Sequence, residues 1–336
     1  MKAQQIIFAA RPQGLPDNKT FKTVTVDLPE LQEGEVLIKP VYYSVDPYMR
    51  GRMNDAKSYI PPFEVGQPIE SGGVATVAES RNSNFQPGDL VMLTSSRPLL
   101  PWATASIYHA SHLKKIDNSV PPSYYLGILG MPGLTAYFGL LDIGKPQKGE
   151  TIVVSGAAGA VGIVVGQIGK IHGCRVVGIA GGAEKVKLLT DAFNFDAAID
   201  YKGNQDIKAS VAAACPNGVD IYFDNVGGEI SDGVIANMNT FGRIPLCGQI
   251  ALYNSTEVPV GPRVQPIMIT RSLLMQGFTI GNYASRFGEG FKALVEWVKQ
   301  GKLKYTETTM EGFDKLPEAF LALFAGKNQG KLIVKV

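Results

Sequence analysis

Six small residues in the middle of the chain have the types and spacing of a phosphate-binding turn. Residues 157–162 read AAGAVG, which is the dinucleotide fingerprint G-x-G-x-x-G with Ala in place of its first Gly. At Gly159 the missing side chain lets the backbone approach a diphosphate, and at Gly162 it lets a helix pack closely on a strand. We predict that a diphosphate binds at Gly159, Ala160, Val161 and Gly162, at the positive end of a helix.

The segments around this turn predict a βαβ unit. The apolar, β-branched residues 151–154 predict a buried strand, residues 159–173 an uncharged helix, and residues 175–180 a second strand. Residues 151–169 contain no charge and would be long enough to span a membrane, but neither flank has a basic cluster. A buried parallel strand with a helix packed on it explains the run better. A close-packed turn that binds no ligand is the alternative for the fingerprint.

The end of the second strand predicts which dinucleotide binds. An NAD site places Asp or Glu about 20 residues beyond the turn, where it accepts from the ribose 2′-hydroxyl. Here Gly181 and Gly182 stand at that tip, followed by Glu184 and Lys185. A 2′-phosphate would meet little repulsion, and Lys185 can reach it as a point charge. We predict NADPH rather than NADH, although Lys185 beside Glu184 could be an ordinary solvated residue.

Composition is that of an ordinary globular enzyme. Of the 336 residues, 45% are hydrophobic and 18% charged, and the net charge of +2 gives no sign of a nucleic-acid or membrane partner. Cys174, Cys215 and Cys247 form no C-x-x-C pair and are expected to be buried thiols. The apolar run near the start is too short for a secretory signal, so we expect a cytoplasmic protein.

The strand and helix patterns predict two domains in an α/β protein. Short strands dominate up to about residue 125, and we expect them at residues 6–10, 22–27, 35–43, 73–79, 89–94 and 103–109. A helix is expected from about residue 132, and then strands at 197–200, 218–223, 242–247 and 274–280 alternate with helices at 184–193, 205–214, 229–238 and 285–300. This alternation predicts a doubly wound parallel sheet. Residues 302–336 return to strand, helix and strand and are expected to pair with the first, mostly antiparallel β domain.

Long motifs in a fixed order carry a family resemblance. They are SVDPYMRGRM (44–53), GMPGLTAY (130–137), the turn at 157–162, YFDNVGG (222–228), CGQ (247–249) with Tyr253 and Asn254, and GKNQGK (326–331). With them the chain resembles the zinc-independent medium-chain dehydrogenases/reductases, in the branch of prostaglandin reductase (leukotriene hydroxydehydrogenase) and alkenal double-bond reductase. Residues 59–62, 181–185 and 215–216 are most similar to the bacterial NADPH-dependent curcumin reductases.

The resemblance covers nearly the whole chain and implies its architecture. A GroES-like β domain would comprise residues 1–127 and 301–336, and a Rossmann domain that binds NADPH would comprise residues 128–300. The wider family suggests a homodimer. Within the branch, a Lys matching Lys185 and a Tyr matching Tyr201 hold the adenosine phosphate. The nicotinamide side is lined by residues matching Asn225, Cys247, Gly248, Tyr253, Phe278, Thr279, Ile280 and Asn328.

Two of these positions also stand out on physical grounds. Asn225 follows an apolar strand, at the edge where doubly wound sheets bind ligands, although an Asx-Gly turn without a ligand would have the same sequence. Tyr201 could equally be a half-buried aromatic residue at a strand end.

The lack of zinc-binding residues in the sequence bears on the reaction. Three scattered cysteines and the pair His109 and His112 cannot supply the ligands of a zinc alcohol dehydrogenase, so we expect no metal. Without a Lewis acid, reduction of a plain ketone is harder to support. Hydride addition to the β-carbon of an enone gives a delocalised enolate, which hydrogen-bond donors stabilise. Tyr253 is the first candidate donor, acting directly or by fixing the ribose 2′-hydroxyl, and a structural Tyr is the alternative.

The expected substrate residues lie in the β domain. Tyr48 and Tyr59 are placed by the resemblance on loops over the active site, where neighbouring prolines favour a rigid wall, although ordinary loop packing is as good an explanation. Arg50 and Arg52 could steer an acidic or phenolic substrate or form surface ion pairs. We predict an NADPH-dependent reductase of the C=C bond in α,β-unsaturated ketones and aldehydes. A quinone reductase and a redox-inert NADPH-binding protein are the alternatives.

Overall fold

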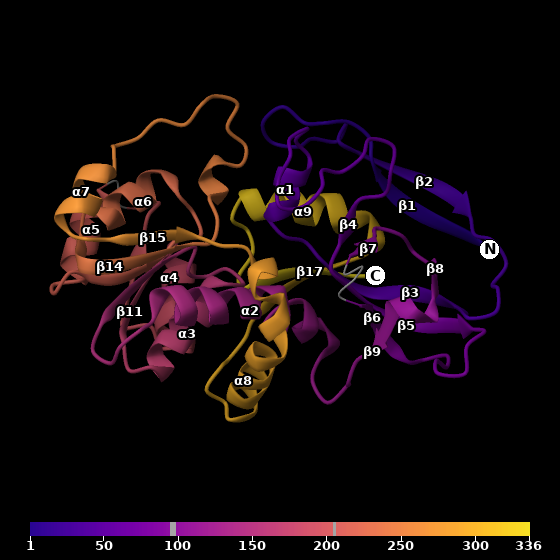
Figure 1. The fold of residues 1–336 in the computed structure, drawn as a ribbon. Coiled ribbons are helices and arrows are strands. Elements are labelled where there is room, and N and C mark those ends of the chain that lie inside the picture. The colour runs from indigo at the N-terminus through magenta and orange to yellow at the C-terminus, as the bar shows by residue number, and fades with distance from the viewer. Residues whose placement is uncertain (95–98, 204–205) are drawn as a thin grey trace. The chain divides into compact units, whose positions relative to one another are not determined.

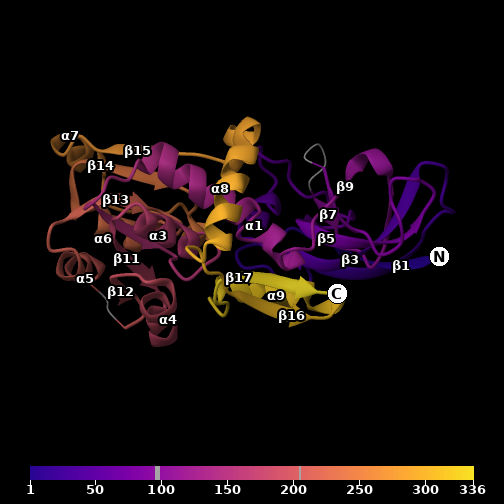
Figure 2. The ribbon, with the colours of Figure 1, turned by 90° about the horizontal axis from the view of Figure 1, so that it is seen from below.

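The computed structural model describes residues 1–94, 99–203 and 206–336. Figures 1 and 2 show its helices and strands. The chain folds into two units. Unit 1 consists of Met1–Leu126, Glu307–Asn328 and Leu332–Val336, and unit 2 consists of Gly127–Thr306 and Gln329–Lys331. Each unit is therefore assembled from segments that are distant in the sequence.

A six-stranded sheet forms the centre of unit 2. Its strands lie in the order β12 (Ala197–Asp200), β11 (Arg175–Ala180), β10 (Thr151–Ser155), β13 (Val219–Phe223), β14 (Met238–Leu246) and β15 (Leu274–Gly277). Every neighbouring pair is parallel, so the carboxyl ends of all six strands lie along one edge. From the central strand β10 the chain proceeds outward through β11 and β12, and it then returns to the other side of β10 to form β13, β14 and β15. The prediction of a doubly wound parallel sheet is confirmed.

Helices cover both faces of this sheet, with α3 on one face and α6 and α7 on the other in Figure 1. They are α2 (Met131–Phe138), α3 (Gly162–Ile171), α4 (Ala183–Phe193), α5 (Ile207–Ala214), α6 (Gly228–Ile235), α7 (Gln265–Thr270) and α8 (Phe287–Lys299), with the shorter helical segments η3 (Gly139–Gly144), η4 (Ile250–Leu252) and η5 (Ile280–Arg286). All five residues of β10 are buried, as are the first eight of α3. Burial on all sides explains why this stretch carries no charge.

Unit 1 is mostly antiparallel. Its seven-stranded sheet has the order β16-β17-β3-β5-β6-β9 with β8 beside β3, and β1-β2 and β4-β7 form two smaller sheets. The strands are β1 (Lys2–Phe8), β2 (Phe21–Asp27), β3 (Glu35–Ser44), β4 (Glu70–Ser71), β5 (Gly73–Ser80), β6 (Leu90–Leu93), β7 (Leu100–Pro101), β8 (Ser106–His109), β9 (Leu113–Lys115), β16 (Glu307–Glu311) and β17 (Lys331–Lys335). Strand β3 pairs antiparallel with β5, β8 and β17, and Ile333 lies opposite Ser44. The mostly antiparallel β domain that the sequence predicts is confirmed.

Short helices complete unit 1 around an apolar core. They are α1 (Tyr48–Arg52), α9 (Leu316–Phe324), η1 (Ala110–His112), η2 (Pro122–Leu126) and η6 (Phe313–Lys315). The core contains Tyr43, Trp102 and Phe320, each with no exposed surface. The Tyr43 hydroxyl donates to the Ala103 carbonyl at 2.9 Å, which satisfies its polar group inside the core.

Several predicted elements differ from the structure in their bounds or type. The strand expected at residues 274–280 ends at Gly277, because Thr279 and Asn282 form a capping box that begins η5. The helix expected at 229–238 ends at Ile235, and Met238 already belongs to β14. Tyr48 was expected on a loop but begins α1. The helix expected at 205–214 begins at Ile207 after an Asp206 cap, while Gln205 lies outside the described residues.

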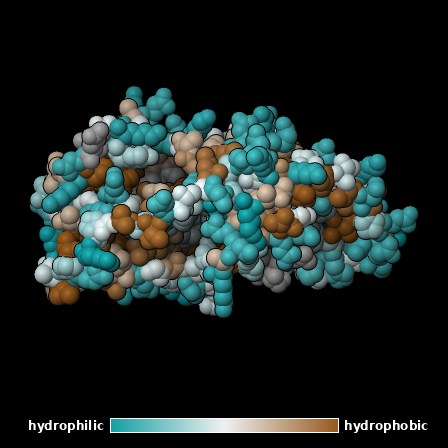
Figure 3. Space-filling model, turned by 90° about the horizontal axis from the view of Figure 1, so that it is seen from above, coloured by the Kyte–Doolittle hydropathy of each residue, from teal (hydrophilic) through white to brown (hydrophobic). Residues whose placement is uncertain are grey.

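The surface is largely hydrophilic. Figure 3 shows one face, on which separate hydrophobic patches lie between hydrophilic side chains. No helix in the described ranges combines the length and apolar character that a membrane crossing requires. Cys174 and Cys215 are buried as predicted, whereas Cys247 is only half-buried because it lies at the end of a strand.

Candidate active site

The carboxyl edge of the unit 2 sheet collects most of the predicted site residues. The segments that leave it are 156–162 after β10, 181–185 after β11, 201–203 after β12, 224–228 after β13, 247–253 after β14 and 278–280 after β15. Doubly wound sheets bind ligands outside this edge. Among the predicted cofactor residues, all of which are described, Asn328 alone belongs to unit 1.

The turn after β10 is shaped by glycine. Gly156 has a φ of +58°, and its carbonyl accepts from the Gly159 N–H at 3.0 Å. A Cβ at Gly162 would lie 2.4 Å from the Gly156 oxygen, so no larger residue fits there. A Cβ at Gly159 would meet only that oxygen, at 3.2 Å, and its other sides are open. Helix α3 begins at Gly162 without a side-chain cap, and the N–H groups of Ile163 and Val164 donate to the Gly159 and Val161 carbonyls at 3.1 Å, so the turn itself completes the start of the helix. Because Gly159 is open, the turn fits a diphosphate.

The ends of β11 and β12 place two lysines close together. Asp200 Oδ1 accepts from the N–H groups of Gly182 at 2.7 Å and of Lys202 at 2.9 Å, which ties the two strand ends to each other. Lys185 is in the first turn of α4 and is half-buried. Burial, and then the positive charge of Lys202, lower the pKa of Lys185. The tip is thus positively charged, as a 2′-phosphate requires.

Sequence reasoning missed two members of this group. Lys202 was overlooked because only the parallel pairing of β12 with β11 brings it near Lys185. Asp200 is an acid near the tip of β11, but its Oδ1 is occupied by two backbone N–H groups. Tyr201 lies between them and packs against Gly181, where an added Cβ would be 2.8 Å from the tyrosine ring. It is 40% exposed, more than a half-buried packing residue would be.

Asn225 is oriented by β10. Its N–H donates to Ser155 Oγ at 3.0 Å, and its Nδ2 donates to the Ser155 carbonyl at 2.8 Å. Because the amide nitrogen faces Ser155, the amide oxygen faces away from it. Asn225 therefore presents a hydrogen-bond acceptor at the edge of the sheet, suited to a hydroxyl or amide donor on a ligand.

Cys247, Gly248 and Tyr253 follow β14. The N–H groups of Cys247 and Gly248 donate to the Asp224 carbonyl at 2.8 and 3.1 Å. Burial, and then the Asp224 carboxylate, raise the pKa of Cys247 to about 12, so its thiol stays protonated at neutral pH. A Cβ at Gly248 would lie 3.1 Å from the Tyr253 hydroxyl, so this glycine leaves room for the phenol.

The Tyr253 hydroxyl has its proton available for donation. Tyr253 ends η4, and its oxygen accepts from the Gln249 N–H at 3.2 Å. Burial is the largest cause that raises the pKa of this phenol above its ordinary value. A hydroxyl that accepts one hydrogen bond still has one proton to donate. Tyr253 can therefore act as a donor or an acid at neutral pH.

The segment after β15 has structural tasks of its own. Phe278 packs edge-on against Phe223 with ring centroids 6.3 Å apart, and a Cβ at Gly139 would lie 2.4 Å from the Phe278 ring. Thr279 caps η5, and Ile280 is its first residue. All three are half-buried at the end of β15.

The predicted substrate residues are in unit 1. Tyr48 packs against the core, and burial, followed by the charge of Asp46, raises its pKa. Tyr59 is 67% exposed. Arg50 is 3% exposed rather than on the surface, and its guanidinium donates to the Gly14 carbonyl at 2.7 Å and to Asn54 Oδ1 at 2.7 Å.

Arg52 has an unusual environment for a buried cation. It is 7% exposed, its Nε donates to the Pro61 carbonyl at 2.9 Å, and its guanidinium lies 4.0 Å from the centre of the Phe63 ring. Its Nη2 is 3.3 Å from Glu70, while Nη1 is buried without a hydrogen-bond partner among the described residues. The sequence left open substrate steering or a surface ion pair for Arg52, and the structure shows its guanidinium buried beside a partly exposed Glu70.

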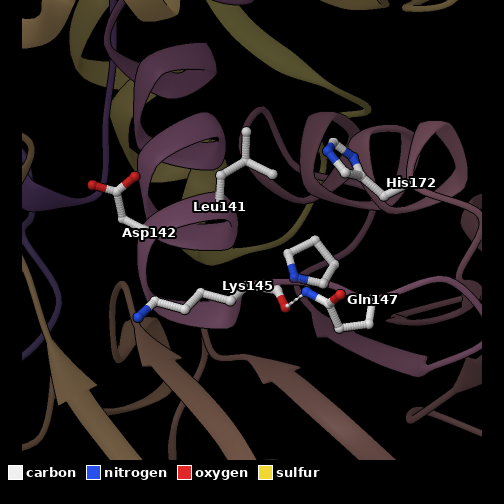
Figure 4. A pocket seen from close by; sticks show the side chains of 6 residues that line it. Leu141, Asp142, Lys145, Gln147 and His172 are labelled. Atoms are coloured by element: carbon white, nitrogen blue, oxygen red, sulfur yellow. Dashed lines mark hydrogen bonds between the residues drawn. The ribbon is translucent and has the colours of Figure 1, made fainter.

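A pocket of about 700 Å³ lies elsewhere in unit 2 (Figure 4). It is lined by Leu141, Asp142, Lys145, Pro146, Gln147 and His172. These residues precede β10 and β11, so the pocket lies at the amino edge of the sheet, opposite the predicted site. None of the predicted site residues lines it. Within the described residues, no three His, Cys, Asp or Glu side chains are grouped so that they could hold a metal ion.

Comparison with known proteins shows the family. Residues 4–116 match the family model described as the N-terminal domain of oxidoreductase, and residues 160–300 match the one described as zinc-binding dehydrogenase. The chain is 54% identical to the putative NADP-dependent oxidoreductase YfmJ of Bacillus subtilis, over 99% of this chain and 97% of that protein. It is 44% identical to the NADPH-dependent curcumin reductase of Escherichia coli, over 98% and 96%.

A solved structure agrees with these relatives. CurA from Vibrio vulnificus in complex with NADPH superposes with a TM-score of 0.92 at 43% identity, over 99% of both chains. Prostaglandin reductase 1 of Bos taurus is 44% identical over 96% of this chain and 95% of that protein. The chain therefore belongs to the medium-chain dehydrogenases/reductases, in the NADPH-dependent branch that includes the curcumin and prostaglandin reductases.

Proposed function

We propose that the protein is an NADPH-dependent reductase of the C=C bond in α,β-unsaturated ketones and aldehydes. One observation carries the proposal: a diphosphate-binding turn, the Asn225 acceptor and the Tyr253 hydroxyl all lie at one edge of one sheet. The names of several relatives describe this chemistry, among them the 2-alkenal reductase of Nicotiana tabacum, which is 43% identical over 99% of this chain.

The adenosine end of the cofactor is held by charge. The turn at Gly159, Ala160, Val161 and Gly162 takes the diphosphate, and Lys185 and Lys202 take the 2′-phosphate. Tyr201, whose ring packs against Gly181, lies beside the adenosine. Two cations at one tip give NADPH an advantage over NADH, since NADH has only a neutral hydroxyl there.

The reaction is completed by residues near the other end of the cofactor. Bound NADPH supplies the hydride. We assign the nicotinamide end to Asn225, through its amide oxygen, and to Cys247, Gly248, Phe278, Thr279, Ile280 and Asn328. Tyr253 donates a hydrogen bond to the carbonyl oxygen of the substrate, where negative charge develops as the enolate forms. Tyr253 either delivers the proton or fixes the ribose hydroxyl that delivers it.

We assign substrate binding to the β domain, residues 1–127 and 301–336, and cofactor binding to residues 128–300. Tyr48 and Tyr59 form walls of the substrate pocket. Arg50 is held by backbone and amide oxygens, so its contribution is to keep α1 in place beside Tyr48 rather than to contact the substrate by charge.

The wider family suggests that the protein is a homodimer, and unit 2 has a suitable edge. Strand β15 is the last strand of its sheet, and Leu274 in it is 46% exposed. Phe241 and Ile269 are 71% and 78% exposed. An open edge with apolar neighbours favours a second copy. Sedimentation should show a dimer in the wild type and a monomer in Leu274→Lys. We also propose a cytoplasmic location, which cell fractionation tests.

The first experiment is oxidation of NADPH by the purified protein with a simple alkenone, followed by mass analysis of the product. We expect a saturated ketone, formed faster with NADPH than with NADH. An allylic alcohol, or oxidation with quinones alone, would contradict the double-bond assignment. NADPH binding without turnover of any acceptor would indicate a redox-inert binding protein instead.

A further inference from the structure

A carboxylate that the proposed reaction does not use is buried at the carboxyl edge of the sheet. Asp224 directly follows β13 and is 1% exposed. Its Oδ1 accepts from Ser155 Oγ at 3.0 Å, the Tyr222 hydroxyl at 2.8 Å, and the N–H groups of Val226 and Gly227 at 2.9 Å, and its Oδ2 accepts from Ser231 Oγ at 2.9 Å. Charge-assisted hydrogen bonds of this kind are stronger than neutral ones. Asp224 therefore joins β10, β13 and α6 at one point.

The first consequence concerns Asn225. Because the Ser155 hydroxyl donates its proton to Asp224, its oxygen is left to accept from the Asn225 N–H. The Ser155 carbonyl accepts from Asn225 Nδ2, and so the same serine fixes both the backbone and the side chain of Asn225. The direction in which the Asn225 amide oxygen points thus depends on Asp224.

The second consequence concerns the turn that ends in Tyr253. The Asp224 carbonyl accepts from Cys247 and Gly248, as described above. Further along, the carbonyls of Asn225 and Val226 accept from the N–H groups of Ile250 and Ala251, at 3.4 and 3.1 Å. The η4 turn therefore rests on the loop that the Asp224 carboxylate holds.

We infer that Asp224 is a positioning residue, whose carboxylate sets the orientation of Asn225 and of the turn that bears Tyr253. It thereby shapes the nicotinamide end of the cofactor site, while its own side chain is too deeply buried to contact a ligand. The inference rests on the proposed function. It predicts that loss of the carboxylate harms binding of the nicotinamide half of the cofactor and leaves binding of the adenosine half unchanged.

Asp224→Asn tests this by calorimetry with two ligands. It keeps the size of the side chain and one acceptor oxygen but replaces charge-assisted hydrogen bonds by neutral ones. NADPH carries both halves of the cofactor, and adenosine 2′,5′-bisphosphate carries only the half that Lys185 and Lys202 contact. We expect the Kd for NADPH to rise about tenfold and the Kd for the bisphosphate to stay within about twofold of the wild type.

Asp220→Asn is the matched control. Asp220 lies on the same strand near its amino end, where it accepts from the Thr151 N–H at 2.8 Å and from Asn239 Nδ2 at 2.8 Å. Its replacement also removes a carboxylate with backbone and side-chain donors, and it should lower the Tm without changing either Kd. The comparison of the two variants thus distinguishes a positioning role, which changes the Kd for NADPH, from a general loss of stability, which changes only the Tm.

Equal weakening of both ligands in Asp224→Asn, or weakening of neither, would overturn the inference. If that variant does not fold, Ser231→Ala removes one of the five donors and should raise the Kd for NADPH alone, by about threefold. An unchanged Kd in folded Ser231→Ala would then overturn the inference. A wild-type protein that binds the bisphosphate and NADPH but reduces no enone would contradict the proposed function and not the positioning role.

Discussion

Removal of Lys185 and Lys202 should convert an NADPH-specific protein into one that accepts both cofactors. Lys185 is in the first turn of α4, after β11, and Lys202 follows the neighbouring parallel strand β12, whose last residue Asp200 is hydrogen-bonded to backbone N–H groups. Lys185→Ala removes a half-buried cation, and Lys202→Ala removes an exposed one. Their contributions should differ, because solvent screens the exposed charge more strongly.

The expected magnitudes follow from this difference in exposure. A hydrogen bond to a charged group contributes about 1.5–3 kcal/mol, so Lys185→Ala should weaken NADPH binding by roughly 10- to 150-fold. An exposed pair contributes about 0.2–1 kcal/mol, so Lys202→Ala should weaken it by at most about fivefold. NADH binding should change little in either variant, since NADH lacks the 2′-phosphate.

The assay is kcat/KM for NADPH and for NADH with one alkenone at saturating concentration, for both single variants and the double variant. Lys187→Ala is the control, because Lys187 is exposed on the same helix two residues further along. High salt should lower the NADPH preference of the wild type and have less effect on the double variant. A double variant that keeps the wild-type ratio of NADPH to NADH would refute the assignment of the tip to the 2′-phosphate.

Three further predictions concern the same edge. Tyr253→Phe should lower kcat by about 10²- to 10⁴-fold; full activity would remove the phenol from the mechanism. Gly162→Ala should cost about 1–3 kcal/mol of stability, seen as a lower Tm, because its Cβ would clash with backbone, whereas Gly159→Ala should keep its Tm and lose NADPH affinity. Burial and Lys202 lower the pKa of Lys185, and the charged form binds phosphate, so NADPH preference should decline with rising pH before an ordinary lysine titrates at about 10.4; a preference that persists to that pH would contradict this.

Local sequence was sufficient for the elements whose signals are strong. The buried strand at β10 and the glycines of the following turn follow from hydrophobicity and from the conformations that only glycine allows. Weak local signals failed at element ends. Thr279 and Asn282 decide the end of β15 through a side-chain cap that competes with the apolar run before it. The α1 helix has only five residues, too few for a periodic pattern.

Contacts between distant residues were out of reach of the sequence pattern. Lys202 comes near Lys185 because β12 pairs in parallel with β11, and the five donors around Asp224 come from β10, β13, α6 and the loop between β13 and α6. A surface ion pair was one of the two possibilities that the sequence left open for Arg52, yet its guanidinium is buried against Phe63. The spacing of residues along the chain does not predict such contacts, since each depends on the completed tertiary structure.

The pairing of β17 with β3 constrains the order in which unit 1 can form during synthesis. Strand β17 is internal in its sheet, between β16 and β3, so Ile333 must reach Ser44 before the sheet is complete. The ribosome makes all of residues 127–306 between these two strands. Until then β3 is unpaired on that side at residues 42–44, beyond the part that pairs with β8, and an unpaired strand edge of this kind invites pairing with other chains. Most of unit 1 is synthesised before unit 2, but its sheet is complete only after unit 2 has been made. Nascent chains that stall within unit 2 should therefore be prone to aggregation.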